Sequence, residues 1–170
     1  MKILAFTDLH LSSLALKKIK LKIKNQKPDI LICAGDITIF EQDLDYILNK
    51  LNKLNKPLLL IHGNHETDFV IKKLCKKYKN INFIHKKHYK YTNHLFFGYG
   101  GSGFALIEPG FYKTGEKFQK IIKKNKGKKI ILVTHAPPYN TKLDLIVSSH
   151  CGNKTFRNFV TRNKIDLYIC

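Results

Sequence analysis

The sequence predicts an α/β fold in which helices pack on a largely parallel sheet. Two observations support this prediction. Short apolar runs end repeatedly at glycine or at polar residues, and segments with helical apolar spacing lie between them. No linker, repeat or low-complexity stretch interrupts this alternation, and 170 residues suit one domain, so residues 1–170 are expected to fold as a single unit.

The first strands and helices are predicted from their apolar patterns. Buried strands are expected at Lys2 to Thr7, Asp29 to Ala34 and Pro57 to His62, because each is an apolar run with polar, proline or glycine boundaries. Helices are expected at Gln42 to Leu54 and around Val70 to Tyr78, where apolar residues recur every three or four positions.

Lys18 to Lys24 is ambiguous, because lysine alternates strictly with an aliphatic residue there. Such alternation is typical of a half-buried strand. Parallel strands on either side, however, need a crossover of about a dozen residues or more, usually a helix. We therefore predict a helix for this segment.

The second half continues the alternation with short apolar runs and amphipathic segments. We expect further strands and two helices, in chain order at Ile81 to Ile84 (strand), Leu95 to Tyr99 (strand), Glu116 to Lys124 (helix), Lys129 to Thr134 (strand), Lys154 to Arg162 (helix) and Asp166 to Cys170 (strand).

The chain is strongly basic, with 31 Lys and Arg against 12 Asp and Glu and a formal charge of +19. Such a charge is compatible with nucleic-acid binding. Only Arg157 and Arg162 are arginine, however, and bidentate recognition of bases and phosphates favours arginine. A solvated lysine coat is the preferred interpretation, with polyanion binding as the alternative.

The expected compartment is the cytoplasm. No apolar run approaches the roughly 20 residues of a membrane span, and the start lacks the apolar core of a signal peptide. The four cysteines form no Cys-x-x-Cys pair, which argues against a zinc ribbon or a redox pair. They are expected to act as small hydrophobic residues in a reducing environment.

Polar residues follow four of the predicted strands, and in such sheets ligands gather beyond the carboxyl ends of the strands. The candidate site residues are two aspartates, one asparagine and three histidines: Asp8, His10, Asp36, Asn64, His65 and His135. Carboxylate, imidazole and amide oxygen suit Mn²⁺, Fe or Zn²⁺. Taken singly, Asp-x-His can be a helix cap and Gly-Asp a plain turn; their coincidence at successive strand ends favours a metal site.

These motifs resemble those of calcineurin-like metallophosphoesterases: Asp8-x-His10, Gly35-Asp36, Gly63-Asn64-His65-Glu66 and Thr134-His135. The resemblance covers the whole chain and implies a four-layer α-β-β-α sandwich with two divalent cations, Mn²⁺ being the first expectation and Fe, Zn²⁺ or Ni²⁺ the alternatives.

The resemblance also implies a role for each residue. Asp8 and His10 would hold the first metal, Asp36 would bridge both, and Asn64 and His135 would hold the second. His65 would lie outside the metal shell and stabilise or protonate the departing oxygen. Glu66 stands where many relatives have Asp, as the partner of His65.

One part of the family pattern is absent. The family continues with Gly-His-x-His after a further strand, whereas this sequence has neither histidine, and its last predicted strand is Asp166 to Cys170. The expectation is therefore a fragment of a longer protein, with its C-terminal strands missing, or else a truncated form with an impaired site. The nearest remaining histidine, His150, has a loop-like context and is not assigned to the site.

Two other sequence patterns resemble ligand-binding motifs but are interpreted as structural. Gly98-x-Gly100-x-x-Gly103 fits a dinucleotide motif, but no helix is predicted directly after it and lysines stand where the ribose-binding acid belongs. A glycine-rich strand end beside the metal site is preferred. His85 and His88 lie in a lysine-rich stretch and are expected to be solvated.

The function expected from these residues is phosphate ester hydrolysis. Two cations lower the pKa of a shared water, and a bridging hydroxide attacks phosphorus in line while His65 serves as the acid. A phosphodiesterase acting on a small ester is expected. The alternatives are an impaired scaffold or binding module of the same fold, and a nuclease or nucleic-acid-binding protein. Membrane association is not expected, and the sequence leaves the oligomeric state open.

Overall fold

The computed structural model describes all of residues 1–170. Along the chain its elements are β1 (Ile3–Phe6), α1 (Ser13–Gln26), β2 (Ile30–Cys33), α2 (Leu44–Asn52), β3 (Leu58–Leu60), α3 (Asp68–Cys75), β4 (Ile81–Phe83), β5 (Lys87–Tyr91), β6 (His94–Tyr99), α4 (Pro109–Lys124), β7 (Lys129–Thr134), β8 (Leu145–Ile146), β9 (Ser149–His150), α5 (Lys154–Arg162) and β10 (Leu167–Ile169). None of the helices is long and apolar enough to cross a bilayer.

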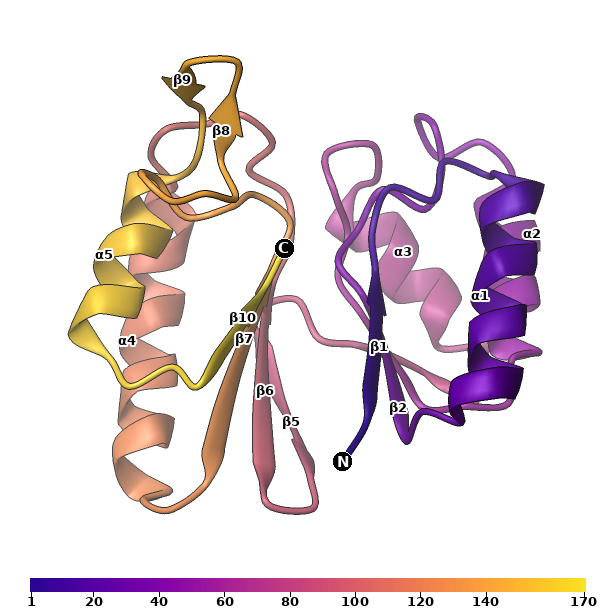
Figure 1. Ribbon diagram of the computed structural model, residues 1–170, viewed down its shortest axis with the longest axis horizontal. Helices are drawn as coiled ribbons and strands as arrows, with labels where there is room; N and C mark the ends of the chain where they lie inside the picture. The colour runs from indigo at the N-terminus through magenta and orange to yellow at the C-terminus, as the bar shows by residue number, and fades with distance from the viewer.

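The strands form two four-stranded sheets and a small hairpin, β8-β9. The first sheet has the order β1-β2-β3-β4 and is parallel throughout. The second has the order β10-β7-β6-β5, in which only β5 is antiparallel to its neighbour. The two sheets lie face to face, with α1 to α3 outside the first and α4 and α5 outside the second (Figure 1). The predicted four-layer α-β-β-α sandwich is confirmed.

Alternation along the strands explains why the sheets stack. In β2, Leu31 and Cys33 face the core beneath α1 to α3, whereas Ile30 and Ile32 face the second sheet. Buried strands of this kind are apolar on both faces, so each can be covered by a helix layer on one side and a sheet on the other. Apolar periodicity alone therefore predicts where the strands lie in the sequence, but not how many sheets they form.

A glycine lets the sheets approach closely. A Cβ atom placed on Gly98 of β6 would lie 2.6 Å from the Ile84 side chain and 2.9 Å from that of Ile61. The β6 strand therefore presents no side chain at this position, which lets its backbone approach Ile61 and Ile84 of the first half.

Most of the predicted elements are confirmed. The ambiguous Lys18 to Lys24, predicted as a helix, is part of helix α1, which is capped by the Ser12 side chain. Three differences remain. Helix α4 begins at Pro109, earlier than the predicted Glu116, because proline suits the first turn of a helix. The alternating, lysine-rich Lys87 to Tyr91 is an edge strand, and the β8-β9 hairpin lies in a stretch expected to be a loop.

Candidate metal centre

The carboxyl ends of β1, β2, β3 and β7 open into one cavity of about 360 Å³. All six candidate side chains line it: Asp8, His10, Asp36, Asn64, His65 and His135. Five come from loops of the first sheet, and only His135 follows a strand of the second. The structure thus brings together every residue that the strand-end argument singled out.

Backbone hydrogen bonds align the first two loops of the site. The Asp8 N–H donates to the Gly35 carbonyl at 3.2 Å, and the His10 N–H donates to the Asp36 carbonyl at 3.1 Å. Asp8, His10 and Asp36 have φ angles of 52°, 43° and 51°, a region that side chains other than glycine rarely adopt. Such conformations concentrate at functional sites, where the surrounding structure holds them in place.

The two motif glycines are required by close contacts. A Cβ on Gly63 would lie 1.9 Å from Asp36 Oδ1. Gly35 has a φ of 105°, and a Cβ there would lie 2.5 Å from the Gly63 nitrogen. Both positions therefore allow the Asp36 carboxylate to lie directly against the loop that carries Asn64 and His65.

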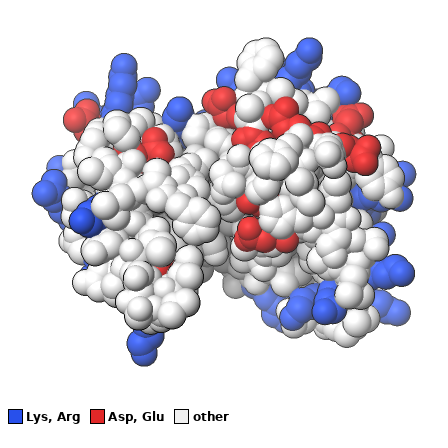
Figure 2. Space-filling view, turned by 90° about the horizontal axis from the view of Figure 1, so that it is seen from above, with Lys and Arg blue, Asp and Glu red and all other residues white.

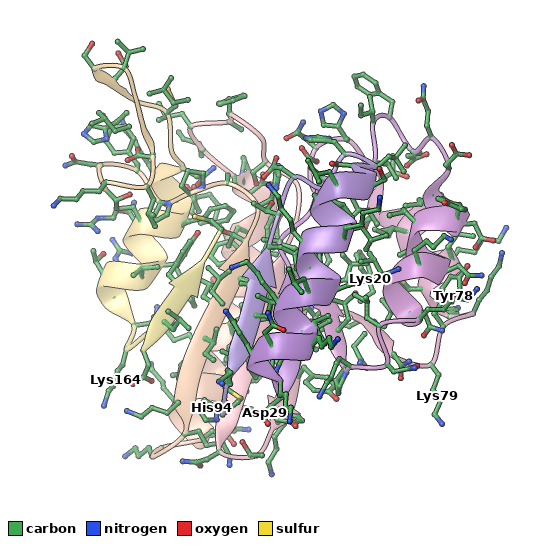
Figure 3. All side chains as sticks on the ribbon, turned by 45° about the vertical axis from the view of Figure 1, so that its right-hand side comes forward. Lys20, Asp29, Tyr78, Lys79, His94 and Lys164 are labelled. Atoms are coloured by element: carbon green, nitrogen blue, oxygen red, sulfur yellow. The ribbon has the colours of Figure 1, made fainter.

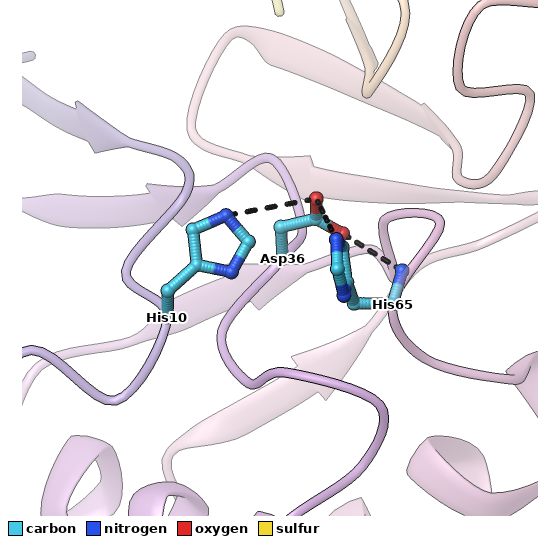
Figure 4. Close-up of side chains that lie close together, drawn as sticks. All are labelled: His10, Asp36 and His65. Carbon is cyan, nitrogen blue, oxygen red and sulfur yellow. Dashed lines mark hydrogen bonds and ion pairs between the residues drawn. The ribbon is translucent and has the colours of Figure 1, made fainter.

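Asp36 lies at the centre of the donor atoms (Figure 4). Its Oδ2 is 3.4 Å from His135 Nε2 and 3.9 Å from Nε2 of both His10 and His65. Asp8 Oδ1 is 3.6 Å from His10 Nε2. The donors fall into two groups, each with atoms within 4.8 Å of one another, and Asp36 belongs to both: His10, Asp36 and His65, and Asp8, Asp36 and His135.

Hydrogen bonds to carbonyls fix the tautomers of two histidines. Because a carbonyl only accepts, His10 Nδ1–H donates to Thr38 O and His135 Nδ1–H donates to Ala34 O, both at 2.9 Å. The Nε2 atoms consequently face the site, and His135 Nε2 lies 3.0 Å from the Asn64 Oδ1 acceptor. Carboxylate, imidazole and amide oxygen atoms converge here, and this donor set fits a metal ion.

The charges at the centre are mutually stabilised. Burial by itself would raise the pKa of Asp36, but the hydrogen bonds from His135 and from the His65 backbone hold that pKa below its ordinary value. Burial likewise opposes the charged form of His135, and the neighbouring Asp36 carboxylate nevertheless raises the pKa of this histidine. The site therefore retains a carboxylate at its centre.

Glu66 has a role that the sequence did not reveal. Its carboxylate is 5% exposed and accepts hydrogen bonds from the backbone N–H groups of Asp36, Thr38 and Gly63 at 3.2, 2.9 and 3.0 Å. The Thr38 hydroxyl adds a fourth at 2.9 Å. Glu66 thus joins the two loops that carry the ligands. The expected partnership with His65 is not formed in the structure.

His65 lies beside Asp36 with one nitrogen free. Its backbone N–H donates to Asp36 Oδ1 at 3.0 Å, while its Nδ1 is buried without a hydrogen-bond partner. The ring packs against Phe40 and edge-on against His10, with centroids 4.7 and 5.0 Å away. These two neighbours fix the orientation of the imidazole, whose Nε2 faces the cavity together with the other donors.

The glycine-rich segment after β6 lies beside the site, as expected. The Gly101 N–H donates to His62 O at 3.0 Å, and a Cβ on Gly103 would touch Asn64 at 3.4 Å. The expectation of solvated histidines after β4 is wrong for one of the pair. His85 is 8% exposed and accepts a hydrogen bond from the Gly100 N–H at 2.8 Å, whereas His88 is exposed on β5.

His150 lies outside both donor groups and does not line the cavity. It belongs to the short strand β9 rather than to a loop, and its Nδ1 pairs with Asp144 Oδ1 at 2.8 Å. Asp144 is buried, yet hydrogen bonds from the backbone of Thr141 and from His150 hold its pKa well below the ordinary value. The pair organises the chain between β7 and α5.

The positive charge of the chain lies away from the cavity. None of the residues that line it is Lys or Arg. Seen from above, Asp and Glu gather mainly over the half built by the first sheet, while Lys and Arg lie along the outer edge (Figure 2). Lys20, Lys79 and Lys164 extend from the flanks and the opposite end of the fold (Figure 3). This distribution supports the lysine-coat interpretation.

Comparison with known proteins agrees with the fold and the donor set. The sequence model of the calcineurin-like phosphoesterases matches residues 1–170, and the chain belongs to this family. The family consists of metal-dependent enzymes that act on phosphate esters, together with inactive members.

Individual relatives extend this result. The chain is 33% identical over 179 residues to an uncharacterized protein of Methanocaldococcus jannaschii, MJ1162, covering all of this chain and 78% of that protein. The crystal structure of TT1561 from Thermus thermophilus matches with a TM-score of 0.74 at 17% identity, covering 98% of this chain and 79% of the other. Another solved chain matches with a TM-score of 0.83, also at 17% identity, with 98% and 82% covered. These two structures share the fold.

Proposed function

We propose that this protein is a phosphodiesterase with a dinuclear metal centre, acting on a small phosphate ester in the cytoplasm. The observation that carries the proposal is the position of Asp36, which belongs to both groups of converging donors. One carboxylate shared by two donor groups is what a pair of neighbouring cations needs. The proposal treats residues 1–170 as one catalytic domain.

The ligand assignment follows the motif order. It differs from the two distance groups, which place His65 with His10 and Asp8 with His135. Asp8 and His10, whose Oδ1 and Nε2 lie 3.6 Å apart, would hold one cation. Asn64 and His135, whose Oδ1 and Nε2 lie 3.0 Å apart, would hold the other, with Asp36 shared between them. The carbonyls of Thr38 and Ala34 orient the two histidines through Nδ1, which supports ligation through Nε2. Mn²⁺ is the proposed metal because the donors combine carboxylate, imidazole and amide oxygen. When bound, the cations supply Lewis acidity and activate water for attack on phosphorus.

His65 is proposed to act on the leaving group. Its Nε2 lines the cavity beside Asp36, and the packing of Phe40 and His10 holds its ring in place. In that position the imidazolium gives a proton from Nε2 to the ester oxygen as the P–O bond breaks. The product alcohol then leaves without carrying a negative charge.

The cytoplasmic part of the proposal is supported by the cysteines. All four are unpaired, and Cys33 and Cys75 are buried. Burial raises the pKa of Cys75 to about 12, which leaves this thiol protonated and unreactive at neutral pH. Such cysteines suit a reducing compartment.

A metal titration coupled to an activity assay tests the proposal. Protein stripped with a chelator is titrated with Mn²⁺ by calorimetry and assayed with bis(p-nitrophenyl) phosphate. We expect two cations per chain and metal-dependent hydrolysis, and Asp36→Asn should lower kcat/KM more than about 100-fold, beyond the usual loss for residues that only support metal ligands.

The matched control is Asp45→Asn, which removes a carboxylate from the exposed side of α2. This variant should retain its metal and its turnover, because exposed ion pairs such as Asp45–Lys77 contribute little. Normal turnover in Asp36→Asn would contradict the site assignment. A wild-type chain that neither binds Mn²⁺ nor hydrolyses the ester would instead be a binding module with this fold.

A further inference from the structure

The cavity has a second wall that the metal donors do not explain. Opposite the loops of the first sheet it is lined by large apolar side chains, Phe104, Leu143 and Ile146. Phe104 is 80% exposed and Leu143 63% exposed, although both face a cavity rather than the core. Exposed apolar side chains gathered beside a polar cluster are typical of a ligand-binding surface.

The charge of the cavity limits what can bind against this wall. The chain carries a formal charge of +19, yet no Lys or Arg lines the cavity. A ligand group with its own negative charge would therefore find no Lys or Arg partner along this wall, where Asp144 is the only charged residue. An uncharged organic group bound against the wall, in contrast, would cover its apolar side chains and remove them from water, which favours binding.

The segment that carries the wall is well organised. The Asp144 carboxylate accepts backbone N–H bonds from Asn140, Thr141 and Gly152 at 2.9, 2.8 and 3.0 Å. Its backbone carbonyl accepts from the Cys151 N–H at 2.9 Å. Because these bonds close the loop on both sides of the β8-β9 hairpin, Leu143 and Ile146 are held in place before a ligand arrives.

We propose that this apolar wall binds an uncharged apolar or aromatic ester group of the substrate. The inference rests on the proposed phosphodiesterase function and specifies its substrate class: a diester whose only charge is that of the phosphate. In this arrangement the cations held by Asp36 and its neighbours would bind the phosphate, while Phe104, Leu143 and Ile146 contact the organic group. They act as specificity-determining residues.

Three diesters with the same leaving group test the proposal, so that the bond being broken stays constant. They are phenyl, methyl and 4-carboxyphenyl p-nitrophenyl phosphate, assayed with the Mn²⁺-loaded full chain. We expect the phenyl ester to exceed the methyl ester in kcat/KM by about tenfold, the size of discrimination that an apolar pocket achieves. The 4-carboxyphenyl ester, which has the same ring and one more charge, should fall to or below the methyl ester.

Variants then assign the preference to the wall. Phe104→Ala and Leu143→Ala should each remove most of the phenyl preference by raising KM for the phenyl ester, with the metal content unchanged. Val147→Ala is the matched control, because Val147 follows β8, is 96% exposed and does not line the cavity. It should leave all three esters unchanged.

The outcomes separate this inference from the function on which it rests. Hydrolysis of all three esters at similar kcat/KM overturns the substrate class and leaves the phosphodiesterase proposal intact. A phenyl preference that survives in both wall variants also overturns it. Failure of the wild-type protein to hydrolyse any of the esters overturns the proposed function itself.

Discussion

The two halves of the molecule build opposite sides of one cavity with different chemistry. The first sheet contributes Asp8, His10, Asp36, Asn64 and His65 through short loops with strained backbone. The second sheet contributes His135, and the longer segments that follow β6 and β7 contribute Phe104, Leu143 and Ile146. Under the proposed function, changes in the first half should affect metal binding, and changes in the second half other than at His135 should affect the choice of substrate.

The largest effect is expected from Gly63→Ala. The added methyl group would lie 1.9 Å from Asp36 Oδ1 and 2.6 Å from the Asp36 nitrogen, so the central carboxylate must move. We expect kcat/KM to fall more than about 100-fold with loss of bound metal, and the free energy of unfolding to drop by roughly 1–3 kcal/mol from overpacking.

Gly127→Ala provides the comparison for this glycine. Gly127 has a positive φ, of 88°, which Gly63 does not have, and a Cβ there meets nothing within 4 Å. This variant should lose a little stability and keep both its metal and its turnover. Equal losses of activity and of metal content in the two variants would show that the clash with Asp36 is not responsible.

Glu66→Gln should weaken metal binding without removing a ligand. The glutamine amide keeps one oxygen as an acceptor, but its NH₂ group would face backbone N–H donors that now bond to the carboxylate. These are the N–H of Thr38 on one side, or those of Asp36 and Gly63 on the other. We expect the Kd for Mn²⁺, measured by calorimetry, to rise about 10- to 100-fold.

Glu41→Gln is the matched control for Glu66. Glu41 also accepts hydrogen bonds through its carboxylate, from the Thr67 N–H and hydroxyl at 2.7 Å, but on the exposed side of the same loops. The Kd of the Glu41→Gln variant for Mn²⁺ should stay near the wild-type value. Similar losses in both variants would argue against a special role for the buried carboxylate.

Asp144→Asn tests the second half in the same way. The asparagine NH₂ would face either the N–H groups of Asn140 and Gly152 or the N–H of Thr141. The loop around the β8-β9 hairpin would therefore lose some of the hydrogen bonds that hold it. We expect KM for aromatic diesters to rise a few-fold and the Kd for Mn²⁺ to stay constant. A change in metal affinity as large as that of Glu66→Gln would break the proposed division between the two halves.

The smallest effect on activity is expected at the contact between the halves, where His85 and His62 pack with ring centroids 4.5 Å apart. Burial, aided by His62, Lys86 and Lys72, lowers the pKa of His85 from 6.5 to about 3. Between pH 6.5 and about pH 3 the unfolded chain therefore binds more protons than the folded chain. Stability should fall as the pH is lowered from 6.5 toward 3.

Urea unfolding at pH 7 and pH 4.5 measures this dependence. His85→Gln removes the titrating group and should reduce the slope by at most about 1.4 kcal/mol per pH unit, while turnover at pH 7 stays near normal. An unchanged slope would exclude His85 as the source of the acid sensitivity.

The sequence predicted the strand ends well because parallel strands necessarily bring their carboxyl ends to the same edge. Asp8, Asp36 and Asn64 could therefore be assigned to one site before their distances were known. The same reasoning placed His135 in that sheet, whereas it follows β7 of the second sheet and reaches the site because the two sheets stack. The division into two sheets came from the family resemblance instead, since a strand with two apolar faces packs equally well against a helix or a sheet.

Other features depend on contacts between segments distant in the chain. The role of Glu66 rests on hydrogen bonds to Asp36 and Thr38, which lie 28 to 30 residues earlier in the chain. His85 is buried because Gly100, 15 residues later, donates its N–H to the ring. The wall residue Leu143 lies in a stretch with no periodic pattern, where Asp144 organises the loop. Local periodicity carries no information on such pairings.

The hydrogen bonds of Glu66 also bear on how the protein exchanges its metal. Its carboxylate holds the loops of Asp36 and Gly63 through bonds within the chain, so the ligands remain in register without a cation. Little ordering entropy is then lost when a cation enters, in contrast to small domains that fold only around their metal. We therefore expect one cation to be exchanged for another without unfolding, so that the metal bound would follow the supply in the surroundings.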